Sequence, residues 1–141
     1  MKTFKDSAGR NWTITINVDT VKRLIAGINV NLCELNEGDP PLILALERDA
    51  SRLFDVVFEV IRPQAETLGV TAQQLAAGID GPSLAEMATA FWGELADFFR
   101  PLRPATAKMI QDVTAIQQPP TDESGPSSGG SPGSSGSTPE S

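Results

Sequence analysis

Residues 53–61 place the strongest constraint on how this chain can fold. In the sequence LFDVVFEVI, only Asp55 and Glu59 are polar. At about 100° per residue, the apolar side chains cover roughly 200° of a helical wheel. A helix with so wide an apolar arc must be covered by other elements on more than one side. We therefore predict that it is the central helix; its apolar residues are Leu53, Phe54, Val56, Val57, Phe58, Val60 and Ile61.

Prolines and polar residues set the limits of this helical region, which we expect over 42–61. Pro40 and Pro41 suit its beginning, because the first turn of a helix does not need their missing N–H groups. Asp49 or Ser51 can divide the region into two helices. Pro63 is predicted to end or kink the second helix, since proline removes a hydrogen bond in a helix interior.

The N-terminal residues have the pattern of a β-hairpin. Residues 11–18 alternate strictly between apolar and polar side chains, which is typical of a half-buried strand. Residues 3–5 alternate around Phe4, and the sequence DSAGR supplies a turn in which Gly9 can adopt a positive φ. A hairpin alone is only marginally stable, so its apolar face must pack on helices. That face holds Trp12, Ile14, Ile16 and Val18.

Apolar residues at helical spacing predict further helices over 21–28, 71–77, 83–100 and 105–117. Asp19 or Thr20 can cap the first, and the sequence from Thr71 to Gln74 is a capping box for the second. We therefore predict an α+β, mainly α fold over residues 1–117. In it, an N-terminal β-hairpin packs on a small bundle of four to five helices.

The C-terminal residues 118–141 differ in composition from the rest of the chain. They are rich in Gly, Ser and Pro, and their only charged residues are Asp122, Glu123 and Glu140. Such a segment cannot bury enough apolar surface to fold. We therefore predict a disordered C-terminal tail, acting either as a solubilising segment or as a linker.

The chain has few residues suited to catalysis or metal binding. It contains no histidine and one cysteine, Cys33. This composition excludes an imidazole acid–base pair, a Ser-His-Asp triad and a zinc site of the CxxC type. No glycine-rich loop has the spacing of a phosphate or dinucleotide site. We predict a protein that is not an enzyme, with no catalytic residues, no metal and no cofactor, and we interpret Cys33 as a small buried apolar residue.

Asp55 and Glu59 lie one helical turn apart and resemble a pair of catalytic carboxylates. Arg52 and Arg62 flank them on the same helix. Charged residues at this spacing are typical of a helix surface. We therefore interpret them as a solvated polar face.

The charge of the chain bears on its partners. The net charge is −7, of which the tail contributes −3. No stripe of Lys and Arg is present to neutralise phosphates, so we expect no binding to nucleic acid or to anionic membranes. The N-terminus lacks the apolar segment of a secretory signal, and no apolar run approaches the ~18 residues of a membrane span. A cytoplasmic location is the expectation.

Aromatic residues gather on the predicted helix over 83–100. Its apolar arc includes Phe91, Trp92, Leu95 and Phe99. We interpret this arc as core. The alternative is that part of it, chiefly Trp92 and Phe99 at its edge, forms an exposed patch that binds a partner. Trp12 carries the same ambiguity, although its strand face favours the core.

The order of these elements resembles a known family. The resemblance covers residues 3–100 and consists of the hairpin motif F-x-D-x-x-G-R-x-W, then V-D-T-V-K-R-L and NVNLCEL, and a late helix of the type A-T-A-F-W-G-E-L-A-D-F-F. This layout is similar to that of the tail assembly chaperones of long-tailed bacteriophages and prophages. The resemblance implies a small acidic protein of the bacterial host cytoplasm that binds the tape measure protein. Such chaperones keep their client soluble while tail tube subunits polymerise around it.

The resemblance also suggests a role for the tail. In several of these chaperones a programmed frameshift gives a longer form, whose extra domain recruits the tail tube protein. A Gly/Ser/Pro linker would tether two such binding modules. Self-association around a client is a further property of such chaperones, and the sequence sets no copy number. The alternatives are a structural minor tail or head–tail connector protein, and a bacterial adaptor with a helical partner.

Overall fold

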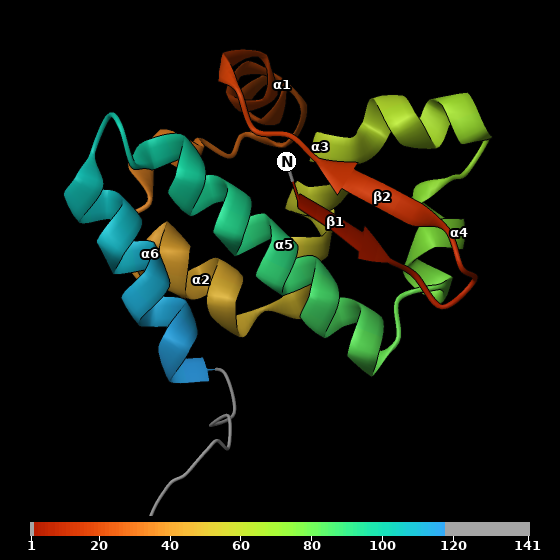
Figure 1. The fold of residues 1–141 in the computed structure, drawn as a ribbon. Helices are drawn as coiled ribbons and strands as arrows, with labels where there is room; N and C mark the ends of the chain where they lie inside the picture. Colours follow the sequence, from red (N-terminus) through yellow and green to blue (C-terminus); the bar gives the residue numbers. More distant parts are fainter. Residues whose placement is uncertain (1, 118–141) are drawn as a thin grey trace, which may run out of the picture.

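The computed structural model describes residues 2–117, so the predicted tail over 118–141 lies outside the described residues (Figure 1). The predicted α+β, mainly α fold is confirmed. Because Asp49 divides the central region, the described residues form six α-helices rather than four or five. The elements are β1 (Lys2–Lys5), β2 (Asn11–Ile14), α1 (Val18–Ile28), the 3₁₀ helix η1 (Leu32–Glu34), α2 (Leu42–Arg48), α3 (Ala50–Leu68), α4 (Ala72–Ala77), α5 (Gly81–Phe99) and α6 (Pro104–Gln117).

Helix α3 lies at the centre of the contacts between elements. It packs against α1, α2, α5 and β2, and α5 in turn packs against α6 and β1. Figure 1 shows α5 crossing the front of the molecule, with the hairpin beside it and α6 folded back along it. The wide apolar arc of residues 53–61 is thus covered from several sides, as its width predicts.

The predicted hairpin is present, but its second strand is shorter than expected. Strands β1 and β2 are antiparallel, and Phe4 pairs with Trp12 in their register. The alternation of buried side chains continues to Ile16. Asn17 then accepts a hydrogen bond from the Thr20 N–H and caps α1, so the predicted cap at Asp19 or Thr20 is wrong. Val18, expected on the inward face, begins the helix and is 66 % exposed.

The turn of the hairpin is organised around the buried carboxylate of Asp6. Its Oδ1 accepts from the backbone N–H groups of Ala8 and Arg10 at 3.0 and 2.9 Å. Its Oδ2 accepts from Arg10 Nε at 2.7 Å and from Trp12 Nε1 at 3.0 Å. Gly9 follows with φ of 85°, a conformation that favours glycine. The residues of F-x-D-x-x-G-R-x-W therefore form one hydrogen-bonded and packed unit.

The outer edge of β2 is covered by a side chain. Gln64 of α3 accepts a hydrogen bond from the Thr13 N–H at 3.0 Å, and its Nε2 donates to the Thr13 carbonyl at 2.6 Å. A single amide thus binds both backbone groups that Thr13 presents away from β1. The contact also fixes the hairpin to the central helix.

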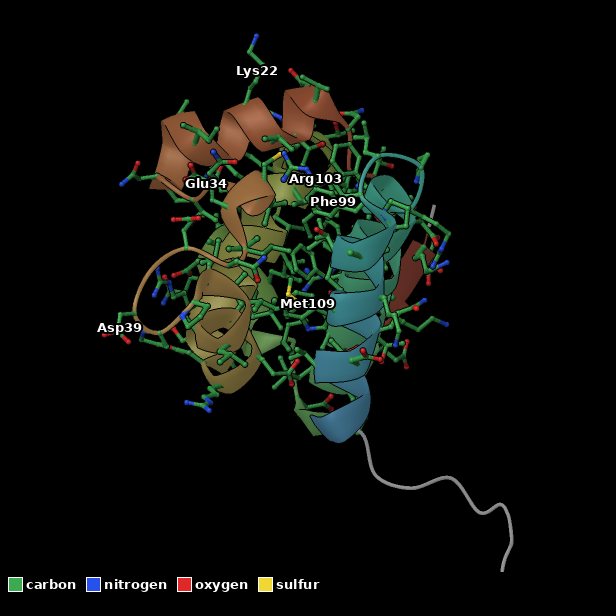
Figure 2. All side chains as sticks on the ribbon, turned by 90° about the vertical axis from the view of Figure 1, so that its left-hand side faces the viewer. Lys22, Glu34, Asp39, Phe99, Arg103 and Met109 are labelled. Carbon is green, nitrogen blue, oxygen red and sulfur yellow. The ribbon has the colours of Figure 1, made fainter. Side chains whose placement is uncertain are left out.

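The remaining connections are held by local caps and by long-range hydrogen bonds, one of which comes from Arg103. The capping box predicted at Thr71 and Gln74 is present, and Asp49 caps α3 by accepting from the Arg52 N–H. Arg103, between α5 and α6, donates to the Cys33 carbonyl of η1 at 3.1 Å. Figure 2 shows Arg103 directed toward η1, and Met109 of α6 in the space beside α2.

We predict that Asp6 makes the stability of this fold depend on pH. Burial acts to raise the pKa of Asp6, but the hydrogen bonds from Trp12 and Arg10 and the Arg10 charge outweigh it, so the pKa is lowered. The carboxylate therefore stabilises the fold above its unfolded pKa of about 3.9, and this contribution is lost as the pH falls through the folded pKa. The stability difference between wild type and Asp6→Asn should be large at neutral pH and shrink below about pH 4.

Denaturant unfolding at a series of pH values measures this difference. Asp39→Asn, which removes the same charge at an exposed position, is the matched control and should show a small difference throughout. A difference for Asp6→Asn that stays constant down to about pH 2.5 would contradict the role of the Asp6 carboxylate.

Candidate functional site

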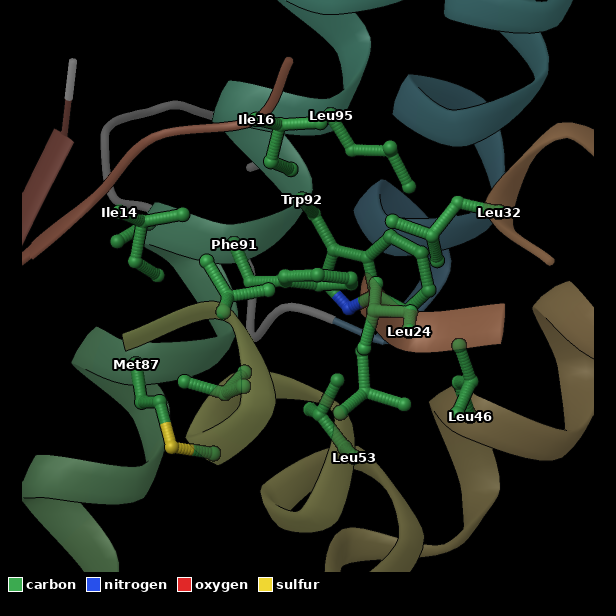
Figure 3. Close-up of a cluster of buried hydrophobic side chains, with 14 of the residues drawn as sticks. Ile14, Ile16, Leu24, Leu32, Leu46, Leu53, Met87, Phe91, Trp92 and Leu95 are labelled. Carbon is green, nitrogen blue, oxygen red and sulfur yellow. The ribbon is translucent and has the colours of Figure 1, made fainter. Parts of the chain in front are cut away.

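The five residues considered for partner binding lie in the core. Trp92 is 5 % exposed, and Trp12, Phe91, Leu95 and Phe99 are each 1 % exposed or less. The alternative of an exposed aromatic patch at these positions is therefore wrong, and the interpretation as core is confirmed. Figure 3 shows Trp92 directed from α5 toward Leu24 of α1 and Leu32 of η1.

The burial of these residues has a physical cause in the packing of α5. Helix α5 contacts α6, β1, α3 and β2, so both edges of its apolar arc are covered. Phe91 and Trp92 pack edge to face with ring centroids 5.0 Å apart. Trp12 donates to Asp6 within the hairpin. Because these side chains hold separate elements together, they stabilise the fold and do not form an exposed binding surface.

A groove runs along helix α3. It has a volume of about 480 Å³ and is lined by α3, by Ile28 at the end of α1, and by the connection from α3 to α4. We call it the α3 groove. Its apolar side chains include Phe54 and Phe58, which are stacked with centroids 6.2 Å apart, and Val70. Phe54 and Val70 are half-buried, so apolar surface remains accessible there.

The groove is long because α3 continues past Pro63, where an end or kink was predicted. The predicted end is wrong: Pro63 lies inside a helix that continues to Leu68. Proline cannot donate to the carbonyl four residues earlier, which is that of Glu59. Arg23 of α1 supplies a substitute, since its Nη1 donates to the Glu59 carbonyl at 2.7 Å and its Nη2 lies 3.4 Å from the Val60 carbonyl.

An ion pair between a buried glutamate and an exposed arginine lies on one side of the groove. Glu59 is only 7 % exposed, so its expected place on a solvated helix face is wrong. The physical reason is that Glu59 packs against Gly27 of α1, which has no side chain to displace it. Both Nε and Nη2 of Arg62 donate to the Glu59 carboxylate. This hydrogen bonding raises the pKa of Arg62, so the guanidinium stays charged.

Arg62 also covers part of the apolar surface of the groove. Its guanidinium carbon lies 5.1 Å from the centroid of the Phe58 ring, a distance at which a cation is attracted to an aromatic face. The single cation among the groove residues is therefore engaged within the protein, by Glu59 and by Phe58. Its interaction with Glu59 neutralises both charges locally.

Two further carboxylates, Asp55 and Glu66, line the groove and are exposed. Within the described residues, the Asp55 side chain forms no hydrogen bond or ion pair, and the Glu66 side chain interacts only with the more distant charge of Arg62. With Glu59 and Arg62 paired, Asp55 and Glu66 leave the groove with a local charge of −2. The groove thus combines accessible apolar side chains with unpaired negative charge.

Between residues 2 and 117, no group of three or more His, Cys, Asp or Glu side chains is placed to hold a metal ion. Cys33 is half-buried and packs against the core, close to its predicted role. None of the helices in this range has both the length and the hydrophobicity needed to cross a membrane.

Comparisons with known proteins give no relative: no protein family, curated protein or solved structure matches the chain. The candidate site is therefore defined by its geometry.

The exposed patch considered as an alternative lies on α5, whereas the accessible groove lies along α3. The groove was not predicted as a site from the sequence. Its lining includes Phe54, Phe58, Arg62, Glu66 and Val70. The signal that could have found them is the roughly 200° width of the apolar arc on residues 53–61, wider than the ~140° on α5. Phe54, near one edge of this arc, is half-buried, so the arc is not completely covered.

We predict an energetic coupling between Arg23 and Pro63. Arg23→Met should destabilise the protein by about 1–3 kcal/mol, because the Glu59 carbonyl loses its donor. In a Pro63→Ala background the alanine N–H can bind that carbonyl within the helix, so Arg23→Met should cost less, by at least about 0.5 kcal/mol.

Denaturant unfolding of the four proteins measures this double-mutant cycle. Lys22→Met is the matched control, because Lys22 precedes Arg23 on α1 and points away from the body of the protein (Figure 2). It should show no coupling to Pro63. Equal costs of Arg23→Met in the two backgrounds would show that Arg23 does not replace the missing N–H.

Proposed function

We propose that this protein is a tail assembly chaperone of a long-tailed bacteriophage or prophage, acting in the cytoplasm of the bacterial host. In this proposal it is a binding protein and not an enzyme. Its client is the tape measure protein, which it keeps soluble while tail tube subunits polymerise. The observation that carries the proposal is the α3 groove, which presents accessible apolar side chains along a long helix.

The dimensions of the groove support a helical client. From Phe54 to Glu66 the groove follows α3 over more than three turns, or roughly 18 Å. An amphipathic helix binds such a surface by laying its apolar face in the groove, with anchors about one turn apart. Phe54 and Phe58, stacked one turn apart on α3, provide apolar contacts for anchors at this spacing.

The charge of the chain also supports the proposal. A net charge of −7 keeps a complex between chaperone and client soluble by repulsion between complexes. Capture of a client in a groove is stoichiometric and requires no nucleotide. The resemblance of the F-x-D-x-x-G-R-x-W hairpin and the later helices to tail assembly chaperones favours this class of binding protein over a general adaptor.

Co-expression with the tape measure protein encoded nearby tests the proposal. Wild type should keep the tape measure protein in the soluble fraction and co-purify with it. Phe54→Ser should reduce co-purification several-fold, because it removes an accessible apolar side chain from the groove. Leu102→Ser, at a residue 69 % exposed between α5 and α6, is the matched control and should leave binding unchanged.

The possible results separate the competing functions. Circular dichroism and thermal unfolding establish that both variants keep their fold. A tape measure protein that remains insoluble, with no complex formed, would contradict the proposal. Recovery of this protein in purified phage particles would instead favour a structural minor tail or head–tail connector protein.

A further inference from the structure

We infer that the α3 groove selects a cationic amphipathic helix, whose Lys or Arg side chains pair with Asp55 and Glu66. This inference rests on the proposed binding of a helix in the groove, and it adds the chemistry of the helix that is bound. It follows from three observations. These are the positions of the charged residues along α3, the pairing of two of them with each other, and the apolar surface that lies beside them.

The charged residues of the groove form a line along one side of α3. Asp55, Glu59, Arg62 and Glu66 follow one another at intervals of three or four residues, so they lie on the same face of the helix. Asp55 and Glu66 are eleven residues apart, which is about three full turns. Their backbone positions are therefore separated by roughly 16 Å along the helix axis.

The two residues between these ends are engaged with each other. Glu59 accepts two hydrogen bonds from Arg62, and Arg62 also lies over Phe58. A partner carboxylate would find no unengaged cation in the groove and would be repelled by Asp55 and Glu66. A partner ammonium or guanidinium would find a carboxylate at each end of the line, so charge complementarity selects a cationic partner.

The apolar surface beside this line determines the form of the partner. Phe54 and Phe58 lie next to the charged residues on α3, and Ile28 and Val70 contribute from neighbouring segments. When a helix buries its apolar face there, the residues at the border of that face lie beside the charged residues of α3. Two cations about eleven residues apart on one border of that apolar face would reach both carboxylates.

Three designed peptides of about 18 residues test this inference, since that length spans the groove at about 1.5 Å per residue. All share one apolar face. The first carries two lysines eleven residues apart at the border of that face, and the second has glutamates at the same two positions. The third has the two lysines moved to the opposite, polar side of the helix. Fluorescence anisotropy measures the affinity of each peptide for the full chain.

The border-lysine peptide should bind about three- to tenfold more tightly than the other two, as expected for two exposed ion pairs. This preference should shrink when salt is raised from about 0.05 to about 0.5 M, because salt screens exposed charges. Asp55→Asn combined with Glu66→Gln should abolish it. Glu34→Gln combined with Glu37→Gln changes the net charge equally at exposed positions outside the groove and should retain it.

The other outcomes overturn the inference in distinguishable ways. Equal binding of all three peptides would show a groove that takes helices without selecting charge, which leaves the proposed helix binding intact. Binding of none of them would contradict the helix-binding function itself. Loss of the preference in the Glu34→Gln, Glu37→Gln variant as well would reveal general attraction to an acidic protein rather than recognition at Asp55 and Glu66.

Discussion

The burial of α3 determines where the other elements of this protein lie. Elements from before and after it in the sequence, namely α1, β2, α2 and α5, all contact it. Val57 and Ile61 have no exposed surface, so their burial requires these elements to be in place together. The α3 groove lies where this coverage stops, beside Phe54. The candidate binding surface and the core are thus two parts of one apolar arc.

Features that depend on near neighbours in the sequence could be predicted, and features that depend on distant residues could not. The alternation around Trp12, the capping box at Thr71 and the division at Asp49 all arise within a few residues. Where α3 passes through Pro63, the Glu59 carbonyl accepts a hydrogen bond from Arg23, forty residues before the proline. The groove likewise depends on which side of α3 the neighbouring elements leave uncovered. In the sequence, only the width of the apolar arc indicates such a surface.

The residues that carry the resemblance to tail assembly chaperones have a structural role here. Asp6 accepts hydrogen bonds from Arg10 and Trp12, and Gly9 permits the turn. Such a motif specifies how a hairpin folds, and it lies outside the groove. A chain could therefore keep this motif while the residues of the α3 groove change. The proposed binding of a client is therefore tested at groove residues such as Phe54 and Asp55.

The amide of Gln64 affects whether the edge of the hairpin can pair with another strand. A strand edge with unpaired N–H and carbonyl groups is a template for another strand, and proteins block such edges to avoid aggregation. By binding both groups of Thr13, Gln64 takes the place of a neighbouring strand at that position. At Thr13, the outer edge of β2 therefore offers no unpaired backbone group to a third strand. Another chain would have to displace the Gln64 amide before it could pair with β2 at this residue.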